Sequence, residues 1–508
     1  MTDTKNHMLW RARHLAKMGE VRRNPAEYLL CTPWHAGYAL HRRYRREPGF
    51  ESVADYLELV RNPIDPSLSD TRLDHLDSLD DSLGEMVEHA AALRGATMAR
   101  PSLNGCTGAN HMALEAAVRQ HDKIVLATGC HQSIEDWLLI WSYQGLELKL
   151  VYVPTAWSAN SETFLPPTAD EMRATLRDHP DTTLVILTCP TYPGLHPTDL
   201  AETISAIRQG APGARVFIDA AWGTHFGLSP AVPEFPLAGG VDLVTSSDHK
   251  TGLAEEQAAM LYVGTDDPEL LARVESVYRA ITSTSPSNRL LASLDASLVT
   301  LASHGERLVE DACAFADAFR EEVARIEGLK VMGQADLDAD PERFVLDPVK
   351  VFVDVSELGY NGRQVYRLLE RQGRVVPEMA SERGVLFLMT PAYRPRQARD
   401  LADRLRGVLA VSKPRPWPQA PPLPPAPQMA MSPASAIGQA DEPATVHEAR
   451  GRVAASAICI YPPGVYVLRP GQHIDEPTAS YLERALAEGS GAYVQGLRDG
   501  KLLVVSDS

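Results

Sequence analysis

Short apolar runs rich in Val, Ile and Leu recur between residues 80 and 265 and alternate with stretches of helical periodicity. These runs predict strands at residues 124–127, 148–153, 184–188, 215–219, 242–245 and 259–263. Asp199 followed three residues later by Glu202 is typical of a helix start. Strands that alternate with helices in this way indicate a mainly parallel sheet with helices on both faces.

The rest of the pattern divides the chain into further units. Residues 1–75 are too irregular to close a core, which predicts an arm that packs on another domain or subunit. Residues 76–328 hold the strand and helix alternation and end in a long helical stretch, and residues 329–412 form a smaller α/β domain. A Pro/Ala tract at 413–442 predicts an extended tether, or a ligand for a proline-binding partner, before a C-terminal domain at 443–508.

Composition and charge exclude several classes of protein. The 508 residues, 44% of them hydrophobic and 23% charged, suit about three domains at roughly 150 residues each. Acidic residues exceed basic ones by 17 and no long Lys/Arg cluster occurs, so we expect no nucleic-acid partner. No apolar run approaches the ~20 residues of a membrane span and no secretory pattern opens the chain, so we expect a cytoplasmic protein without a membrane partner. The six cysteines form no CxxC pair, and no metal site is expected.

Two of the predicted strands end in residues that can do chemistry. The segment 241–250 ends in Lys250, and an amine at the carboxyl end of a buried strand can be desolvated and act as a nucleophile. The strand at 215–219 ends in Asp219, a carboxylate that can pair with a protonated heterocyclic nitrogen. Each segment alone also fits a simpler interpretation, which is a solvated surface lysine for Lys250 and a turn or helix cap for Asp219.

Two further segments could hold the remainder of a cofactor. Residues 104–110 are mostly small or polar and open a helix, where backbone N–H groups and the helix dipole favour a phosphate. His131 follows the strand at 124–127, and an imidazole there could lie flat on a planar ring. A plain loop-to-helix turn and a structural histidine are the simpler interpretations of these two segments.

The order of the four segments and their residues resemble the Orn/Lys/Arg decarboxylase family, pyridoxal-phosphate enzymes of the aspartate-aminotransferase fold (fold type I). The matching segments are Asn104-Gly105-Cys106-Thr107, Cys130-His131-Gln132-Ser133, residues 188–194, Asp219-Ala220-Ala221-Trp222, Ser247-Asp248-His249-Lys250, Tyr461-Pro-Pro-Gly464 and Arg469-Pro470-Gly471. The resemblance covers about residues 28–500. It implies a three-layer αβα major domain on a mainly parallel seven-stranded sheet, with smaller α/β and C-terminal domains. We expect a short form of the family, since the amino-terminal wing of the large inducible forms is a feature that this sequence departs from. The resemblance also implies a homodimer, or a higher homo-oligomer, with the site at the subunit interface.

The resemblance also implies roles for individual residues. Lys250 would form a Schiff base with pyridoxal 5'-phosphate, Asp219 would pair with the pyridine nitrogen, and His131 would lie on the ring. Further cofactor-binding residues would be Thr107, Gly108 and Ser247 at the phosphate, Ala221 on the opposite ring face, and Cys106 and Thr191. His249 would face the substrate and help return a proton to it, and the substrate would contact Glu378, Trp222 and Arg394.

The activity that the resemblance implies is decarboxylation of arginine, lysine or ornithine to the amine and carbon dioxide. An aminotransferase, or an oxygen-using deaminase or oxidase, on the same cofactor is the alternative. Arg383 and Arg394 are available to clamp the α-carboxylate that an aminotransferase must keep. A non-catalytic relative that binds partners is the second alternative. The chain departs from the family pattern at residues 31–37, Gln132 and Gln472, which leaves the substrate open.

Overall fold

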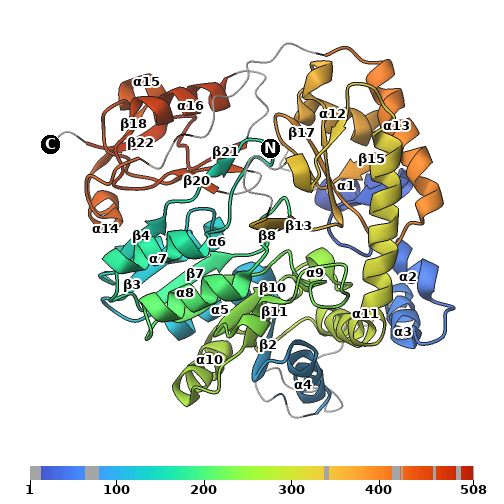
Figure 1. Ribbon diagram of the computed structural model, residues 1–508, viewed down its shortest axis with the longest axis horizontal. Coiled ribbons are helices and arrows are strands. Elements are labelled where there is room, and N and C mark those ends of the chain that lie inside the picture. The colour runs from blue at the N-terminus through green and yellow to red at the C-terminus, as the bar shows by residue number, and fades with distance from the viewer. Residues whose placement is uncertain are drawn as a thin grey trace, which may run out of the picture.

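The computed structural model describes residues 13–62, 79, 81–336, 342–414, 424, 427–461, 465–487 and 493–506, and Figure 1 shows how their helices and strands are arranged. Three features expected from the sequence lie outside the described residues. They are the domain boundary after residue 75, most of the Pro/Ala tract, and residues 462–464 of the Tyr-Pro-Pro-Gly motif.

A seven-stranded sheet forms the centre of the major domain. From edge to edge its strands are β2 (Met98–Ser102), β11 (Ala259–Val263), β10 (Leu243–Ser246), β9 (Arg215–Asp219), β7 (Leu184–Thr188), β3 (Lys123–Ala127) and β4 (Lys149–Val153). Neighbouring strands are parallel from β10 to β4, whereas β11 is antiparallel to both β10 and β2. The expected fold class, an α/β domain on a mainly parallel sheet, is confirmed.

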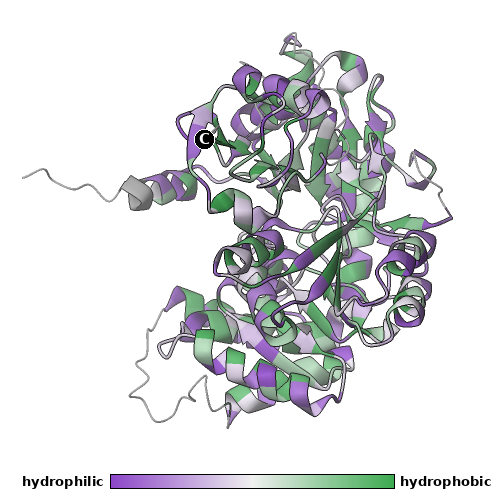
Figure 2. Cartoon of the chain, turned by 90° about the vertical axis from the view of Figure 1, so that its left-hand side faces the viewer, coloured by the Kyte–Doolittle hydropathy of each residue, from purple (hydrophilic) through white to green (hydrophobic). Residues whose placement is uncertain are grey.

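Helices cover this sheet on both faces, and Figure 2 shows the central strands as mainly hydrophobic. On one face α5 (Gly105–Ala117) packs against α6 (Gln132–Tyr143) and α10 (Pro268–Ile281), and on the other α7 (Ala169–Asp178) packs against α8 (Leu200–Gly210). Asp199 caps α8 as predicted, because its side chain accepts the Glu202 N–H at 2.7 Å. The helix α4 (Ser82–Arg94) packs beside β2, and β5 (Trp157–Ser158) and β6 (Thr163–Phe164) form a small hairpin.

The strand β2 was not among the strands expected from the sequence. Its residues include Arg100 and Pro101, which weaken the apolar pattern. It lies at the edge of the described sheet, where Pro101 faces Met260 of β11. An edge strand tolerates a proline because one side of its backbone has no ladder to complete. The other six strands begin and end within one residue of their expected bounds.

The small domain follows helix α11 (Asn288–Val323), which is 36 residues long. Its four-stranded sheet has the order β12 (Lys330–Val331), β14 (Lys350–Asp354), β17 (Gly384–Leu388) and β16 (Met379–Ala380), and its helices are α12 (Gly362–Leu368) and α13 (Ala398–Ala410). The arm holds α1 (Arg13–Arg23), β1 (Tyr28–Leu30), α2 (Ala39–Tyr44) and α3 (Glu51–Arg61). It packs on this domain because β1 pairs with β15 (Val375–Pro377). The pairing of β13 (Phe344–Leu346) with β8 (Leu195–Pro197) joins the small and major domains.

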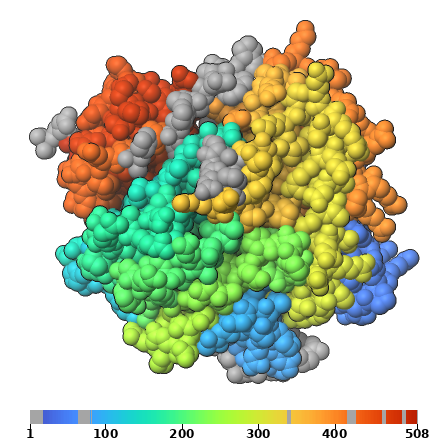
Figure 3. All heavy atoms as spheres, in the orientation of Figure 1, coloured from blue at the N-terminus to red at the C-terminus, as the bar shows by residue number. Residues whose placement is uncertain are grey.

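The C-terminal domain has a hydrophobic core of its own, which includes Ile458, Leu468, Ile474 and Leu482. Its strands are β18 (Asp441–Ala444), β19 (Ile458–Tyr461), β20 (Val465–Leu468), β21 (Tyr493–Gln495) and β22 (Leu502–Val505), and its helices are α14 (Pro433–Ile437), α15 (Val446–Ala449) and α16 (Glu476–Leu486). It lies against the major domain, as the red and teal surfaces of Figure 3 show, with α14 beside α6. None of the helices that the structure describes combines the length and hydrophobicity needed to cross a membrane.

Candidate active site

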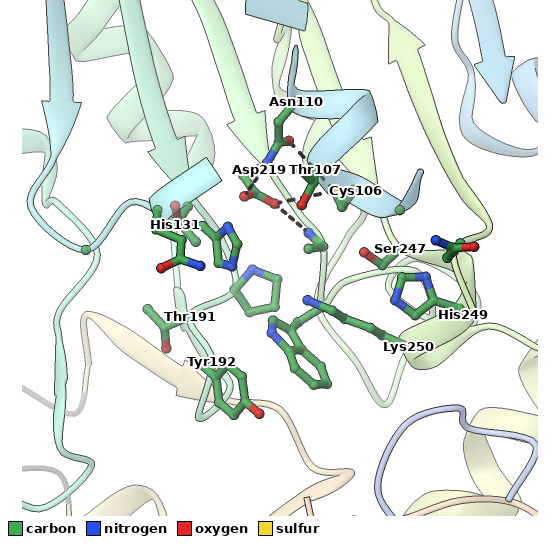
Figure 4. A pocket seen from close by; sticks show the side chains of 18 of the residues that line it. Cys106, Thr107, Asn110, His131, Thr191, Tyr192, Asp219, Ser247, His249 and Lys250 are labelled. Carbon is green, nitrogen blue, oxygen red and sulfur yellow. Dashed lines mark hydrogen bonds between the residues drawn. The ribbon is translucent and has the colours of Figure 1, made fainter. Parts of the chain in front are cut away.

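The carboxyl ends of β3, β7, β9 and β10 meet at a cavity of about 420 Å³, shown in Figure 4. Parallel strands present these ends at one edge of the sheet, which is where open α/β sheets bind ligands. Ten residues singled out from the sequence line the cavity: Cys106, Thr107, His131, Thr191, Asp219, Ala221, Trp222, Ser247, His249 and Lys250. The fold therefore brings together segments that lie up to 144 residues apart in the chain, from Cys106 to Lys250.

Lys250 lies in the short helix α9 (Asp248–Thr251), which begins two residues after β10 ends. Its backbone N–H donates to the Ser247 carbonyl at 2.9 Å, which fixes the turn. The Nζ atom lies 4.4 Å from the centre of the Trp222 ring, and Figure 4 shows the side chain reaching into the cavity. The face of an indole attracts an ammonium group, so Trp222 favours this orientation of the Lys250 side chain when the amine is protonated.

Asp219 is almost fully buried at the end of β9, and its carboxylate is the acceptor for several neighbours. Asn110 Nδ2 donates to Oδ2 and the Ala221 N–H donates to Oδ1, both at 3.0 Å, and Cys106 Sγ lies 3.8 Å from Oδ1. The Thr245 hydroxyl donates to Asn110 Oδ1 at 2.6 Å, which orients the amide so that Nδ2 faces the carboxylate. These donors fix the orientation of the carboxylate at the floor of the cavity.

Asn110 was missed from the sequence, although a local signal was present. It stands four residues after Cys106 in α5, and residues at this spacing lie on one face of a helix. The face of α5 that carries Cys106 to the cavity therefore carries Asn110 to it as well.

His131 is the residue that caps the amino end of α6. Its Nδ1 atom accepts the Ser133 N–H at 3.2 Å and lies 2.9 Å from Ser133 Oγ. Burial lowers the pKa of this histidine to about 4, although Asp219 opposes the change. The ring is therefore neutral at pH 7, and because Nδ1 is an acceptor its proton is on Nε2. Asn110 Nδ2 also donates to Ser133 Oγ at 3.1 Å, so one amide links His131 with Asp219.

The opposite end of the cavity fits an anion. Gly105 opens α5 with a φ of 65°, and a Cβ atom at Gly108 would lie 2.6 Å from Ser102 Oγ, so only glycine fits there. Gly108 is not part of the cavity wall, but it permits the tight first turn in which Thr107 faces the cavity. Ser247 Oγ is buried and has no hydrogen-bond partner among the described residues. A buried hydroxyl without a partner costs free energy, and an anion beside it and the start of α5 would remove that cost.

His249 and Glu256 stand at the mouth of the cavity. His249 Nδ1 lies 2.9 Å from the Ala258 carbonyl, to which it donates, so its Nε2 carries no proton when the ring is neutral. Burial lowers the pKa of His249 to about 4, and Lys250 lowers it further. Nε2 lies 3.7 Å from Glu256 Oε2. Burial raises the pKa of Glu256, and the nearby Glu378 carboxylate raises it further.

Of the three residues expected at the substrate, two lie at or beside the cavity. Trp222 lines it, and Glu378 lies behind the cavity wall, where Oε1 accepts from the Tyr192 hydroxyl at 2.7 Å and Oε2 from the Thr32 N–H at 2.9 Å. Arg394 does not reach the cavity, because it is exposed at the turn before Pro395.

Arg383, the other arginine considered for a carboxylate clamp, is held away from the cavity. Its guanidinium binds the Asp354 carboxylate at 2.6 and 3.1 Å and the Asn160 side chain at 2.7 Å. Neither arginine is among the described residues that line the cavity, and no other arginine is.

Lys350 is a second buried amine, which the sequence did not single out. It begins β14 of the small domain and lies with Nζ 3.9 Å from the centre of the Trp222 ring, donating to the Tyr192 carbonyl. Burial lowers its pKa to about 7. The carboxylates of Asp347 and Glu378 oppose this change, and the positive charge of Lys250 adds to it. No local pattern marks it, because Tyr192 and Trp222, which its amine contacts, stand about 160 and 130 positions earlier in the chain.

The comparison with known proteins agrees with this arrangement. The family model for the Orn/Lys/Arg decarboxylase major domain matches residues 18–397, and the model for the C-terminal domain of that family matches residues 422–492. The arginine decarboxylase of Bacillus subtilis is 27% identical over 82% of this chain and 83% of its own length, and that of Bacillus anthracis is 26% identical over 94% and 93%. The constitutive lysine decarboxylase of Escherichia coli has a similar fold, with a TM-score of 0.72 at 20% identity over 97% of this chain and 82% of that one. The resemblance found in the sequence is thus confirmed, and the chain belongs to the Orn/Lys/Arg decarboxylase family.

Proposed function

We propose that this protein decarboxylates a basic amino acid, arginine, lysine or ornithine, with pyridoxal 5'-phosphate bound covalently to Lys250. One observation carries the proposal: the amine of Lys250, the carboxylate of Asp219 and the hydroxyl of Ser247, which no described residue binds, belong to one cavity. These are the three groups that a phosphorylated pyridine aldehyde needs, and the family to which the chain belongs implies that cofactor.

The residues present fit the cofactor at both of its ends. Ser247, Thr107 and the first turn of α5 would hold the phosphate, and Asp219 would hold the proton on the pyridine nitrogen. His131 and Ala221 would lie against the two faces of the ring. When bound, the cofactor supplies a positively charged ring that withdraws electrons from the α-carbon of an attached amino acid.

The wall of the cavity favours loss of the α-carboxylate. No arginine is among its described residues, and Arg383 is already bound to Asp354. An aminotransferase must keep the carboxylate of its substrate, whereas a decarboxylase gains when that carboxylate is weakly held in a poorly solvated place. The absence of a described clamp therefore supports decarboxylation over transamination.

Two carboxylates, Glu256 in the cavity wall and Glu378 behind it, favour a substrate with a cationic side chain. Burial raises the pKa of the Cys31 thiol, and the carboxylates of Glu378 and Glu256 raise it further. Both carboxylates therefore lie close enough to Cys31 to act on the same region. Glu378 is fixed by the Tyr192 hydroxyl and the Thr32 N–H. A guanidinium or ammonium group would be attracted to this region, which is why a basic amino acid is the proposed substrate.

Proton return to the α-carbon is assigned to Lys250. His249 has a pKa of about 4, so at pH 7 it is neutral, and its Nδ1 proton is held by the Ala258 carbonyl. Its Nε2 is then an acceptor, suited to orient a donor group of the substrate. The amine of Lys250 reaches into the cavity, and we assign the proton transfer to it.

The test is product analysis. The purified protein is incubated with pyridoxal phosphate and each of arginine, lysine and ornithine, and the products are identified by mass spectrometry. Carbon dioxide and the corresponding amine are expected from one of the three. A keto acid or hydrogen peroxide would favour the aminotransferase or oxidase alternative, and no product with bound cofactor would favour a non-catalytic relative.

Two variants test the carboxylate at the substrate end. Glu378→Gln is expected to raise KM for the basic substrate several-fold, since it removes a negative charge from beside the cavity wall while keeping the size of the side chain. Glu370→Gln, which changes an exposed carboxylate in the same domain, is the control and is expected to leave KM unchanged. The homodimer and the cytoplasmic location stay predictions, and sedimentation of the purified protein tests the first.

A further inference from the structure

The C-terminal domain takes part in the cavity as well as packing beside it. Gln495 of β21 is one of the residues in the cavity wall. A second connection runs from Arg469, which follows β20, to Glu135 in the first turn of α6. The two side chains of this ion pair are 3% and 1% exposed, which makes it a buried pair between two domains.

The guanidinium of Arg469 binds the Glu135 carboxylate in a bidentate manner. Arg469 Nη2 donates to Glu135 Oε1 at 2.7 Å, and Nε donates to Oε2. The Tyr152 hydroxyl donates to Oε2 at 2.8 Å, and the guanidinium lies 4.3 Å from the centre of the Tyr152 ring. Both carboxylate oxygens accept hydrogen bonds and one face of the guanidinium lies on a ring, which favours one orientation of the pair.

Neighbouring contacts fix the backbone on the C-terminal side. The Arg469 N–H donates to Gln472 Oε1 at 2.7 Å, and Gln472 Nε2 donates to the Pro427 carbonyl at 3.0 Å. Tyr466 of β20 donates to Asp136, the residue after Glu135. Two successive residues of α6 are therefore held by two side chains of the C-terminal domain.

The position of α6 decides where His131 lies. His131 caps the helix, and Glu135 is four residues further on, so both stand on the same face of the first turn. Replacing a buried ion pair by apolar residues of the same size often leaves the stability of a protein unchanged or raises it, so stability alone does not account for this pair. Removing one partner, in contrast, would leave a buried charge without compensation.

We propose that the Glu135–Arg469 pair couples docking of the C-terminal domain to cofactor binding, with Arg469 as a positioning residue that acts on the cofactor through α6 and His131. This rests on the proposed function in so far as the cofactor is pyridoxal phosphate. Coupling between two sites is reciprocal, so cofactor binding should also tighten the docking of the C-terminal domain.

The test replaces both charges at once, so that no lone charge is left buried. The variant Glu135→Met with Arg469→Met is compared with the variant Arg450→Met with Glu476→Met, which removes a more exposed pair within the C-terminal domain. Two quantities are measured for each protein: the Kd of pyridoxal phosphate by absorbance titration, and hydrogen exchange in β20 with and without pyridoxal phosphate.

In the wild type, pyridoxal phosphate is expected to slow hydrogen exchange in β20. The Glu135/Arg469 variant should bind the cofactor about tenfold more weakly, a typical coupling between sites, and its β20 should no longer respond. The Arg450/Glu476 variant should behave as the wild type. If the Glu135/Arg469 variant fails to fold, Arg469→Lys keeps the charge but loses the bidentate contact, and an intermediate loss of affinity is expected.

Results with the variants or with the wild type could overturn the proposal. An unchanged Kd, a β20 response that survives in the Glu135/Arg469 variant, or an equal loss in the Arg450/Glu476 variant would each show that the pair is structural only. A wild type that does not bind pyridoxal phosphate at all would overturn the proposed function together with this inference. A wild type that binds the cofactor without a response in β20 would overturn this inference alone.

Discussion

Replacing the buried Lys350 with Met should change how the stability of the protein depends on pH. The lysine is only 5% exposed, and burial lowers its pKa from 10.5 to about 7. Between these two pH values the unfolded chain binds a proton at this position and the folded chain does not. The free energy of unfolding must therefore rise with pH across this window, and the contribution of this group disappears in Lys350→Met.

The size of the effect follows from the two pKa values. The gap between 10.5 and about 7 corresponds to about 5 kcal/mol, since one pKa unit is worth about 1.4 kcal/mol. Below pH 7 both the folded and the unfolded chain carry the proton, so the loss of stability caused by burying Lys350 is constant. Above pH 10.5 neither carries it, and this loss of stability vanishes. From pH 7.5 to 9.5 the wild type should gain about 3 kcal/mol relative to Lys350→Met.

The assay is urea unfolding of the cofactor-free protein, followed by tryptophan fluorescence at several pH values. Comparing two matched proteins cancels the titration of all the groups that they share. Lys330→Met is the control, because Asp336 raises the pKa of the exposed Lys330 and the group stays charged in both states over this range. A constant difference between wild type and Lys350→Met from pH 7.5 to 9.5 would refute the reasoning.

Two further predictions concern contacts within the site. Asn110→Leu removes a hydrogen-bond donor to the buried Asp219 carboxylate, and such a bond is worth about 1.5–3 kcal/mol. Pyridoxal phosphate should therefore bind about tenfold more weakly in an absorbance titration. An unchanged Kd would show that cofactor binding by Asp219 does not depend on Asn110. Tyr192→Phe frees Glu378 from one hydrogen bond, so KM for the basic substrate should rise a few-fold while kcat stays within twofold; a large fall in kcat with KM unchanged would assign Tyr192 to the reaction itself.

The sequence was informative wherever the signal was local. Apolar runs with polar ends located six of the seven central strands, because a strand of a parallel sheet that is buried on both faces consists of consecutive apolar residues. Lys250, Asp219 and His131 were recognisable for a related reason, since Asp219 ends such a run and the other two follow one by a few residues. The edge strand β2 was missed because a strand with one free edge can contain Arg100 and Pro101.

The sequence was uninformative where side chains meet across domains. Lys350 reaches Trp222 from the small domain, and Arg469 reaches Glu135 across more than 300 residues of chain. No periodicity links such positions, so only the fold brings them together. Arg394 was wrongly expected at the substrate. Its place in the sequence suggested a contact with the substrate, but the turn before Pro395 directs its side chain to the surface.

The central claim is that the cofactor attaches to Lys250. The most direct measurement is to incubate the protein with pyridoxal phosphate, reduce it with borohydride, and map the modified peptide by mass spectrometry. The account predicts a pyridoxyl group on Lys250 and none on Lys350, the other buried amine beside Trp222. A label on Lys350, or no label on either lysine, would contradict it.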